Sequence, residues 1–353
     1  AGPARKMGGA EQWSPEKACI TSSGAVTGLK VERERVAERG RGGLAGIGMQ
    51  RGAFPLNASS LCFSPFEQDK IAVAGAQHFG IIGNGRQSVF SLSAQGFREV
   101  AGFDTQDAAY GCCWSEANNH HLVTACGDGS VKLWDLGCQS NPLRSLGEHT
   151  KEASGVSWNL VSKDTLLSCS WDQTVKLWNP FAPSSIRTWR EHSMSVYGVA
   201  WSPHSPSVFA SCAGDRSVRA WDARGRASST SLGGHHHEVL CLDWNKYRPT
   251  VLASGAADGN VYLWELRKTD APLRVMRGHR FAVRDVAWSP FSAAELTTAS
   301  YDLTVGVWDA VRGEPLVRML RHHSEFVTGV AYSLFHKGLA ASCSWDKTVC
   351  AWR

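Results

Sequence analysis

The sequence predicts an all-β fold, a seven-bladed β-propeller preceded by a disordered tail, and three observations point to it. A tryptophan recurs at intervals of 43 or 44 residues from Trp134 to Trp352. An aspartate stands six residues before each of these tryptophans, and a second aromatic series from Trp114 to Tyr332 keeps the same spacing. A repeat of about 40 to 45 residues is the length of one four-stranded propeller blade. The chain is therefore expected to fold as a ring of such blades.

A histidine also recurs, 23 residues before the aspartate of each copy from the second onward. This combination is typical of WD repeats, in which a loop histidine, a turn aspartate and a strand tryptophan are linked by hydrogen bonds through a strand serine or threonine. We assign this structural role to His149, Asp172, Trp178, His192, Asp215, Trp221, His235, Asp258, Trp264, His279, Asp302, Trp308, His323, Asp346 and Trp352.

The number of copies predicts seven blades and a tail. Forty-four residues before Trp134, Phe90 ends a weaker copy in which Asn84 stands at the aspartate position. Seven such units place the propeller at residues 46–353 and leave 1–45 as a basic tail that is expected to be disordered. Because the seventh copy has no sequence for its own outer strand, residues 47–53 are expected to supply that strand beside Trp352.

Composition limits the possible functions. The chain has 43% hydrophobic residues, no apolar run near the roughly 18 residues needed to span a bilayer, and no leader, which predicts a soluble, non-secreted protein. Three of the eleven cysteines, Cys169, Cys212 and Cys343, occupy a small-residue position of the repeat and are expected to be buried thiols. After residue 51 the chain has 28 basic and 27 acidic residues, which argues against a nucleic-acid groove.

The residue before each turn aspartate is expected to point into the mouth of the central channel. Three of these residues are large aromatics, Trp171, Tyr301 and Trp345, and the others are Gly127, Gly214 and Ala257. Such a group predicts an apolar surface for a partner. The alternative is that each aromatic packs beneath a neighbouring loop.

Four strings are more specific than the repeat: LCFSPFEQDKIAVAGAQHFGIIGNG from residue 61, WNKYRPTVLASGAADG from 244, WSPFSAAELTTASYDLTV from 288 and HHSEFVTGVAYSLF from 322. They resemble the peroxisomal import receptors for type 2 targeting signals, the peroxin seven family, and the similarity runs from about Phe54 to Arg353. Ordinary WD repeats lack AQHFGIIGNG at this turn, so the first string carries the most weight.

The resemblance implies a function. Receptors of this family bind, in the cytosol, an N-terminal amphipathic helix with Arg, Leu, His and Leu at spaced positions on folded cargo. They act with a co-receptor, either a dedicated protein or a long isoform of the type 1 signal receptor. They deliver cargo to the docking machinery and shuttle to the peroxisomal membrane and matrix. The chain is then not an enzyme and needs no cofactor.

A signal of this kind needs an apolar groove edged by carboxylates. Asp107 and Glu152 lie in the loops that lead into the second and third blades, and we expect them to converge on the guanidinium of the signal; Asp104 is a reserve candidate. The alternative is that these carboxylates only solvate their loops.

Four further candidates stand four residues before the tryptophans of the second series: Tyr110, Tyr197, Leu240 and Arg284. They are expected to face the channel mouth, where Arg284 could hold an acidic residue of cargo or co-receptor.

Other signals are weak. The run His235 to His237 lacks further ligands for a metal, and no nucleophile elbow, phosphate loop or carboxylate pair at hydrolase spacing is present. A general WD-repeat scaffold, such as a substrate adaptor of a ubiquitin ligase or a chromatin reader, remains the alternative function.

Overall fold

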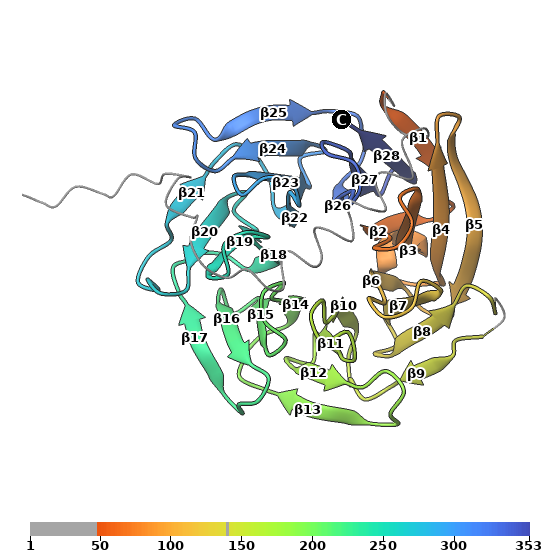
Figure 1. Ribbon diagram of the computed structural model, residues 1–353, viewed down its shortest axis with the longest axis horizontal. Helices are drawn as coiled ribbons and strands as arrows, with labels where there is room; N and C mark the ends of the chain where they lie inside the picture. Colours follow the sequence, from red (N-terminus) through yellow and green to blue (C-terminus); the bar gives the residue numbers. More distant parts are fainter. Residues whose placement is uncertain (1–47, 139–140) are drawn as a thin grey trace, which may run out of the picture.

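The computed structural model describes residues 48–138 and 141–353, and the predicted tail at 1–45 lies outside them. Seven four-stranded antiparallel sheets surround a central channel (Figure 1), which confirms the predicted seven-bladed propeller. Strands are numbered along the chain, and each blade contributes its first strand to the channel wall.

The first four blades contain sixteen strands. Blade 1 comprises β2 (Asn57–Phe63), β3 (Lys70–Ala76), β4 (Gly85–Ser93) and β5 (Gly96–Thr105), with a short 3₁₀ segment, Gln77–Gly80, between β3 and β4. Blade 2 comprises β6 (Ala109–Trp114), β7 (His121–Cys126), β8 (Val131–Asp135) and β9 (Arg144–Leu146). Blade 3 comprises β10 (Ala153–Trp158), β11 (Leu166–Ser170), β12 (Val175–Trp178) and β13 (Ser185–Trp189). Blade 4 comprises β14 (Val196–Trp201), β15 (Val208–Ala213), β16 (Val218–Asp222) and β17 (Ser228–Leu232).

The remaining blades follow the same order. Blade 5 comprises β18 (Val239–Trp244), β19 (Val251–Ala256), β20 (Val261–Glu265) and β21 (Arg274–Met276). Blade 6 comprises β22 (Val283–Trp288), β23 (Glu295–Ser300), β24 (Val305–Asp309) and β25 (Leu316–Leu320). Blade 7 comprises β26 (Val327–Tyr332), β27 (Ala340–Ser344), β28 (Thr348–Trp352) and β1 (Gln50–Ala53).

The core lies between the blades, because each sheet packs its apolar faces on its two neighbours. The second strand of a blade is enclosed on both faces, and every residue of β11 and β19 is buried. The periodic tryptophans fill these interfaces, and Trp178 is 0% exposed. The small-residue position of β11 and its equivalents holds Cys169, Cys212 and Cys343, which are buried and unpaired as the repeat predicts.

The histidine network is complete in blade 3. His149 lies 2.9 Å from Asp172 through Nδ1 and 2.7 Å from Ser168 Oγ through Nε2, and the indole N–H of Trp178 donates to the same Ser168 Oγ at 2.8 Å. The His149 contact, together with hydrogen bonds from Thr174 and a backbone N–H, holds the pKa of the Asp172 carboxyl well below its usual range, although burial opposes this. Blades 4 and 6 repeat these contacts through Ser211 and Thr298.

Blade 5 departs from the expected network, because its aspartate has another partner. The phenol of Tyr262 donates to Asp258 at 2.7 Å, and no hydrogen bond joins Asp258 to His235. His235 keeps its contact with Ser254 Oγ at 2.9 Å, but its buried Nδ1 has no partner within the described part of the chain. This desolvation lowers the pKa of His235 to about 4.

Blade 7 departs in a different way, because a second histidine enters its network. His322 and His323 both place Nε2 2.9 Å from Ser342 Oγ, while Nδ1 of His323 contacts Asp346 at 3.0 Å. The indole N–H of Trp352, whose counterparts in blades 2 to 6 donate to a serine or threonine, is buried and has no partner among the described residues. His322 therefore takes the place of the Trp352 N–H at Ser342.

These two departures predict a pH dependence of stability. The pKa values of His235 and His322 are lowered to about 4 by burial, against 6.5 in an exposed chain. Between those pH values the unfolded chain binds the protons and the folded chain does not, so stability is expected to fall as the pH drops from 6.5 toward 4. In chemical denaturation at pH 7 and pH 4.5, His235→Gln should reduce this loss by roughly 1–3 kcal/mol. If His235→Gln loses as much stability between pH 7 and pH 4.5 as the parent does, protonation of His235 is not a cause of the loss.

The strand β1 occupies the outer edge of blade 7. It pairs antiparallel with β28, with Arg51 opposite Cys350 and Ala53 opposite Thr348. The guanidinium of Arg51 donates to the carbonyl of His322, and Phe54 N donates to Lys347 O at 2.8 Å directly after the strand. The two ends of the described ring are thus joined side by side (Figure 1), which covers the edge that β28 would otherwise expose.

This closure can be tested at one glycine of β1. A Cβ added at Gly52 would lie 2.6 Å from Cβ of Phe97, whereas one added at Gly48 would meet nothing within 4 Å. Gly52→Val is therefore expected to lower the free energy of unfolding by about 1–3 kcal/mol, and Gly48→Val to change it little. Equal effects in denaturant titrations would show that the packing of β1 does not contribute to stability.

Candidate functional site

The mouth of the channel holds a cavity of about 660 Å³. Each of the seven blades contributes one residue of its first strand to the wall: Ser59, Tyr110, Ser154, Tyr197, Leu240, Arg284 and Thr328. This group includes the four residues that were predicted from their spacing to the second tryptophan series, Tyr110, Tyr197, Leu240 and Arg284.

A local irregularity explains why these side chains face the cavity. In every blade the pairing of the first and second strands shifts at this residue; in blade 3, for example, Ala153 pairs with Ser170 and Gly155 with Cys169, which leaves Ser154 unpaired. The same shift occurs at the other six positions. A β-bulge turns the extra residue out of the ladder and re-aims its side chain. The ring of bulges therefore presents seven variable side chains at the channel mouth.

The three large aromatic residues that precede turn aspartates, Trp171, Tyr301 and Trp345, also line the cavity, and we call them the rim aromatics. The same backbone hydrogen bond fixes the turn that holds each aromatic residue, because the N–H of that residue donates to a carbonyl of the loop before the blade. In blade 3, for example, Trp171 N donates to Glu152 O at 3.0 Å. Trp345 is not isolated, because its ring lies 5.2 Å from that of Phe326 and 6.0 Å from that of Tyr301. Aromatic packing and exposure to the cavity therefore coexist here.

The loop after β3 adds a lip to the cavity that was not predicted as part of the site. Phe79 packs on Trp345 with 5.0 Å between ring centroids, and Tyr110 donates its hydroxyl to Gly80 O at 2.7 Å. Phe79 has a left-handed φ of 62°, an unusual conformation for a bulky residue. Ile81 is 80% exposed at the edge of the cavity. These residues lie in AQHFGIIGNG, so the string that distinguishes the sequence also marks this part of the site.

Of the two predicted carboxylates, only Glu152 lines the cavity. The residue equivalent to Glu152 in blade 2 is Ala108, because Gly127 N donates to Ala108 O just as Trp171 N donates to Glu152 O. Asp107 is one position earlier, and its Oδ1 accepts from the Ala108 N–H at 2.7 Å. Burial and the charges of both Glu152 and Asp107 raise the pKa of Tyr110, which lines the cavity, so the convergence of the two carboxylates on one guanidinium stays a prediction.

Asp104 is also not part of the cavity. It lies on the outer strand β5 rather than in the loop, is exposed, and forms an ion pair with Arg86 at 2.6 Å. Arg86 also pairs with Glu99 at 3.0 Å. The expected loop position of Asp104 is wrong, because β5 extends farther along the chain than expected, while its reserve role at the signal stays a prediction.

Glu238 is the carboxylate that sequence reasoning missed. It occupies in blade 5 the place of Glu152 in blade 3, since Ala257 N donates to Glu238 O at 2.9 Å. Its side chain lines the cavity and accepts the hydroxyl of Tyr197 at 3.1 Å. Burial and the charge of Glu238 raise the pKa of Tyr197 to about 12. The equal spacing of Glu152 and Glu238 to Trp158 and Trp244 could have identified it.

Arg284 places a positive charge on the wall of the cavity opposite Glu152. It is partly buried, and no hydrogen bond or ion pair to its guanidinium is found within the described residues. Burial disfavours the charge, but Coulombic interactions with Tyr301, Asp285 and two cysteines outweigh it and raise the pKa of Arg284. The cavity therefore combines apolar walls with two carboxylates and one guanidinium.

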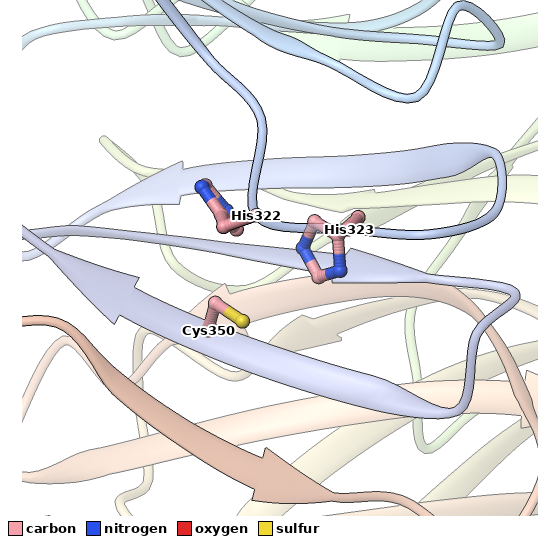
Figure 2. Close-up of side chains that lie close together, drawn as sticks. All are labelled: His322, His323 and Cys350. Atoms are coloured by element: carbon pink, nitrogen blue, oxygen red, sulfur yellow. The ribbon is translucent and has the colours of Figure 1, made fainter.

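One cluster away from the cavity has metal-ligand chemistry. Potential ligand atoms of His322, His323 and Cys350 lie within 4.8 Å of one another (Figure 2). Both ring nitrogens of His323 are already engaged, by Asp346 and Ser342, and His322 also contacts Ser342. In blade 3 the positions of His322 and Cys350 hold an ion pair, Glu148 with Lys176 at 2.9 Å. We therefore assign the cluster to the packing of blade 7.

Comparison with known proteins agrees with this architecture. The family described as "WD domain, G-beta repeat" matches residues 99–135, 140–179, 183–222, 226–265, 270–309 and 314–353, more than half of the chain. Within residues 48–138 and 141–353, no helix is long and apolar enough to cross a membrane.

Individual relatives are more specific. The chain is 47% identical over 134 residues to the "Peroxisomal targeting signal 2 receptor" of Dictyostelium discoideum, which covers 37% of this chain and 42% of that protein. It is 48% identical over 136 residues to "Peroxisome biogenesis protein 7" of Arabidopsis thaliana, 37% of this chain and 43% of the relative. For the "Peroxisomal targeting signal 2 receptor" of Saccharomyces cerevisiae the identity is 35% over 127 residues, 36% of this chain and 34% of the relative. The matched region spans less than half the length of these curated relatives. The chain belongs to the WD-repeat family, and within that family it is similar to proteins named peroxisomal targeting signal 2 receptors.

Proposed function

We propose that this protein is a receptor for type 2 peroxisomal targeting signals, which it binds with a co-receptor on folded cargo in the cytosol. The observation that carries the proposal is the cavity at the channel mouth, where aromatic walls lie beside the carboxylates of Glu152 and Glu238. The names of the relatives support the same function. In this proposal the receptor shuttles between the cytosol and the peroxisome and hands its cargo to the docking machinery.

The chemistry of the cavity suits an amphipathic signal helix. A helix places residues three and four apart on one face, so its leucines form a stripe that can pack against Trp171, Tyr301 and Trp345. Glu152 lies directly before β10 and would accept hydrogen bonds from the signal's arginine. Glu238 offers a second acceptor for the signal's histidine. Charge-assisted hydrogen bonds of this kind gain strength where apolar walls exclude water.

The lip supplies a place for the co-receptor. Ile81 and Ile82 are 80% and 67% exposed, next to Phe79 at the edge of the cavity. A bound helix would bury one face in the cavity and leave the other uncovered. A co-receptor that rests on Ile81 and Ile82 would cover that face, which is why we propose that the signal is bound by the two proteins together. The role is one of recognition rather than catalysis, since every polar group of the cavity that we assign acts in charge pairing.

The test is a pull-down with a type 2 signal fused to a carrier protein, with and without a co-receptor. We expect retention of the full chain only when the signal is intact and the co-receptor is present. A matched carrier whose signal arginine and first leucine are both replaced by alanine is the control. Absence of retention with co-receptor present would overturn the proposal and favour a general scaffold function.

A further inference from the structure

Glu152 and Arg284 lie on opposite walls of the cavity. Glu152 precedes β10 in blade 3, and Arg284 is the bulged residue of β22 in blade 6. Two blades lie between them on one side of the ring and three on the other, and Figure 1 shows β10 and β22 facing each other across the channel. The wall around Arg284 holds the apolar residues Leu240 and Ala282, and the carboxylate of Glu238 from the adjacent blade 5. The cavity therefore has Glu152 on one wall, and Arg284 beside a second carboxylate, Glu238, on the other.

Arg284 has donors without acceptors. A guanidinium offers five N–H donors, and none is hydrogen-bonded within the described chain. Its neighbour Asp285 does not neutralise it directly, because the two carboxylate oxygens of Asp285 accept the backbone N–H groups of Val286 and Val330 at 2.9 Å. Glu238 of the adjacent blade accepts the hydroxyl of Tyr197 and forms no ion pair with Arg284.

A second donor in the same cavity is also unsatisfied. The indole N–H of Trp171 is buried and has no hydrogen-bond partner among the residues described. A partly desolvated charge or donor without a partner costs free energy, which an acceptor of a bound ligand would recover. Trp171 belongs to blade 3, on the wall of Glu152, so on the wall of blade 6 the unsatisfied donors are those of Arg284.

We infer that Arg284 is the binding site for a carboxylate of the bound helix. The cavity then discriminates between the two directions in which the helix could bind, in addition to recognising its apolar face. The cation of the ligand lies at Glu152, and its acidic residue lies across the channel at Arg284. A helix bound in the reverse direction would place like charges together, which is strongly unfavourable. The identity of the ligand rests on the proposed function, whereas the polarity of the site rests on the positions of Glu152 and Arg284.

The experiment is a glutamate scan of a labelled signal peptide, with affinity measured by fluorescence anisotropy in the presence of co-receptor. Glutamate is placed singly at positions one to three helical turns after the arginine, about 5–16 Å along the axis. We expect one position at which glutamate tightens binding to the parent protein relative to glutamine. That preference should be lost in Arg284→Gln and reversed in Arg284→Glu, with a change of roughly 10- to 100-fold. Lysine at the same peptide position should bind Arg284→Glu better than the parent.

Two control variants separate the effect of Arg284 from a general effect of charge and from a failure to fold. Arg280→Glu makes the same charge change at an exposed arginine of the loop before β22, outside the cavity, and should leave the preference intact. If Arg284→Glu does not fold, Arg284→Lys keeps the charge without the planar fork and should weaken the preference without abolishing it. Binding of the parent with no glutamate preference at any position would overturn the inference while leaving the proposed function standing. No binding of any peptide would overturn the proposed function instead.

Discussion

Glu152→Lys is expected to weaken binding of the signal by about 2–5 kcal/mol, or roughly 30-fold to several thousand-fold in affinity. The change places an ammonium where we expect the signal's guanidinium, and it leaves that guanidinium unpaired beside the apolar wall. Glu152 lies in a loop outside the histidine network, so thermal stability should stay within about 0.5 kcal/mol of the parent. Anisotropy titrations with labelled peptide and thermal melts measure the two quantities separately.

The structure supplies a matched control for this variant. Asp107→Lys makes the same charge change in the neighbouring loop, but Asp107 does not line the cavity and its side chain accepts a backbone N–H. Its effect on affinity should be much smaller. A signal whose arginine is replaced by glutamate should bind Glu152→Lys better than it binds the parent. If both lysine variants behave alike and this exchange gives no rescue, Glu152 does not hold the arginine.

Trp178→Ala is expected to destabilise the protein by about 3–5 kcal/mol, because Trp178 is 0% exposed and its indole donates to Ser168. Trp171→Ala should cost far less, since Trp171 is partly exposed at the cavity and its indole N–H has no partner among the described residues. Signal binding should instead be reduced by Trp171→Ala. Chemical denaturation and peptide titration of the two variants separate the roles.

The loss of stability in Trp345→Ala should lie between the losses in Trp171→Ala and Trp178→Ala. Its ring contacts Phe79, Tyr301 and Phe326, so its loss removes packing as well as a contact surface for the ligand. We expect both a measurable loss of stability and weaker binding. Equal destabilisation by Trp171→Ala and Trp178→Ala would show that the rim tryptophans are core residues, and the apolar wall of the cavity would then not be a binding surface.

The repeat made most of the fold predictable. The spacing of Trp134 to Trp352, with an aspartate six residues before each tryptophan, was sufficient for seven blades, because each residue of a repeat meets the same neighbours in every copy. The same spacing identified Tyr110, Tyr197, Leu240 and Arg284 as wall residues of the cavity. It could not foresee the departures at His235 and Trp352, since these depend on Tyr262 and His322, which lie outside the periodic set.

The sequence by itself determined the blades, the buried tryptophans and thiols, and the three rim aromatics, because all of these follow from a strict period. The tertiary structure alone decided which charges meet at the channel mouth. Asp107 and Glu152 lie in corresponding loops, but Asp107 is one position earlier and is not among the lining residues, whereas Glu238 from a distant loop is one of them. Side-chain direction in a loop changes with each residue of register, and in these loops the register is set by backbone hydrogen bonds between loop and turn that the composition does not encode.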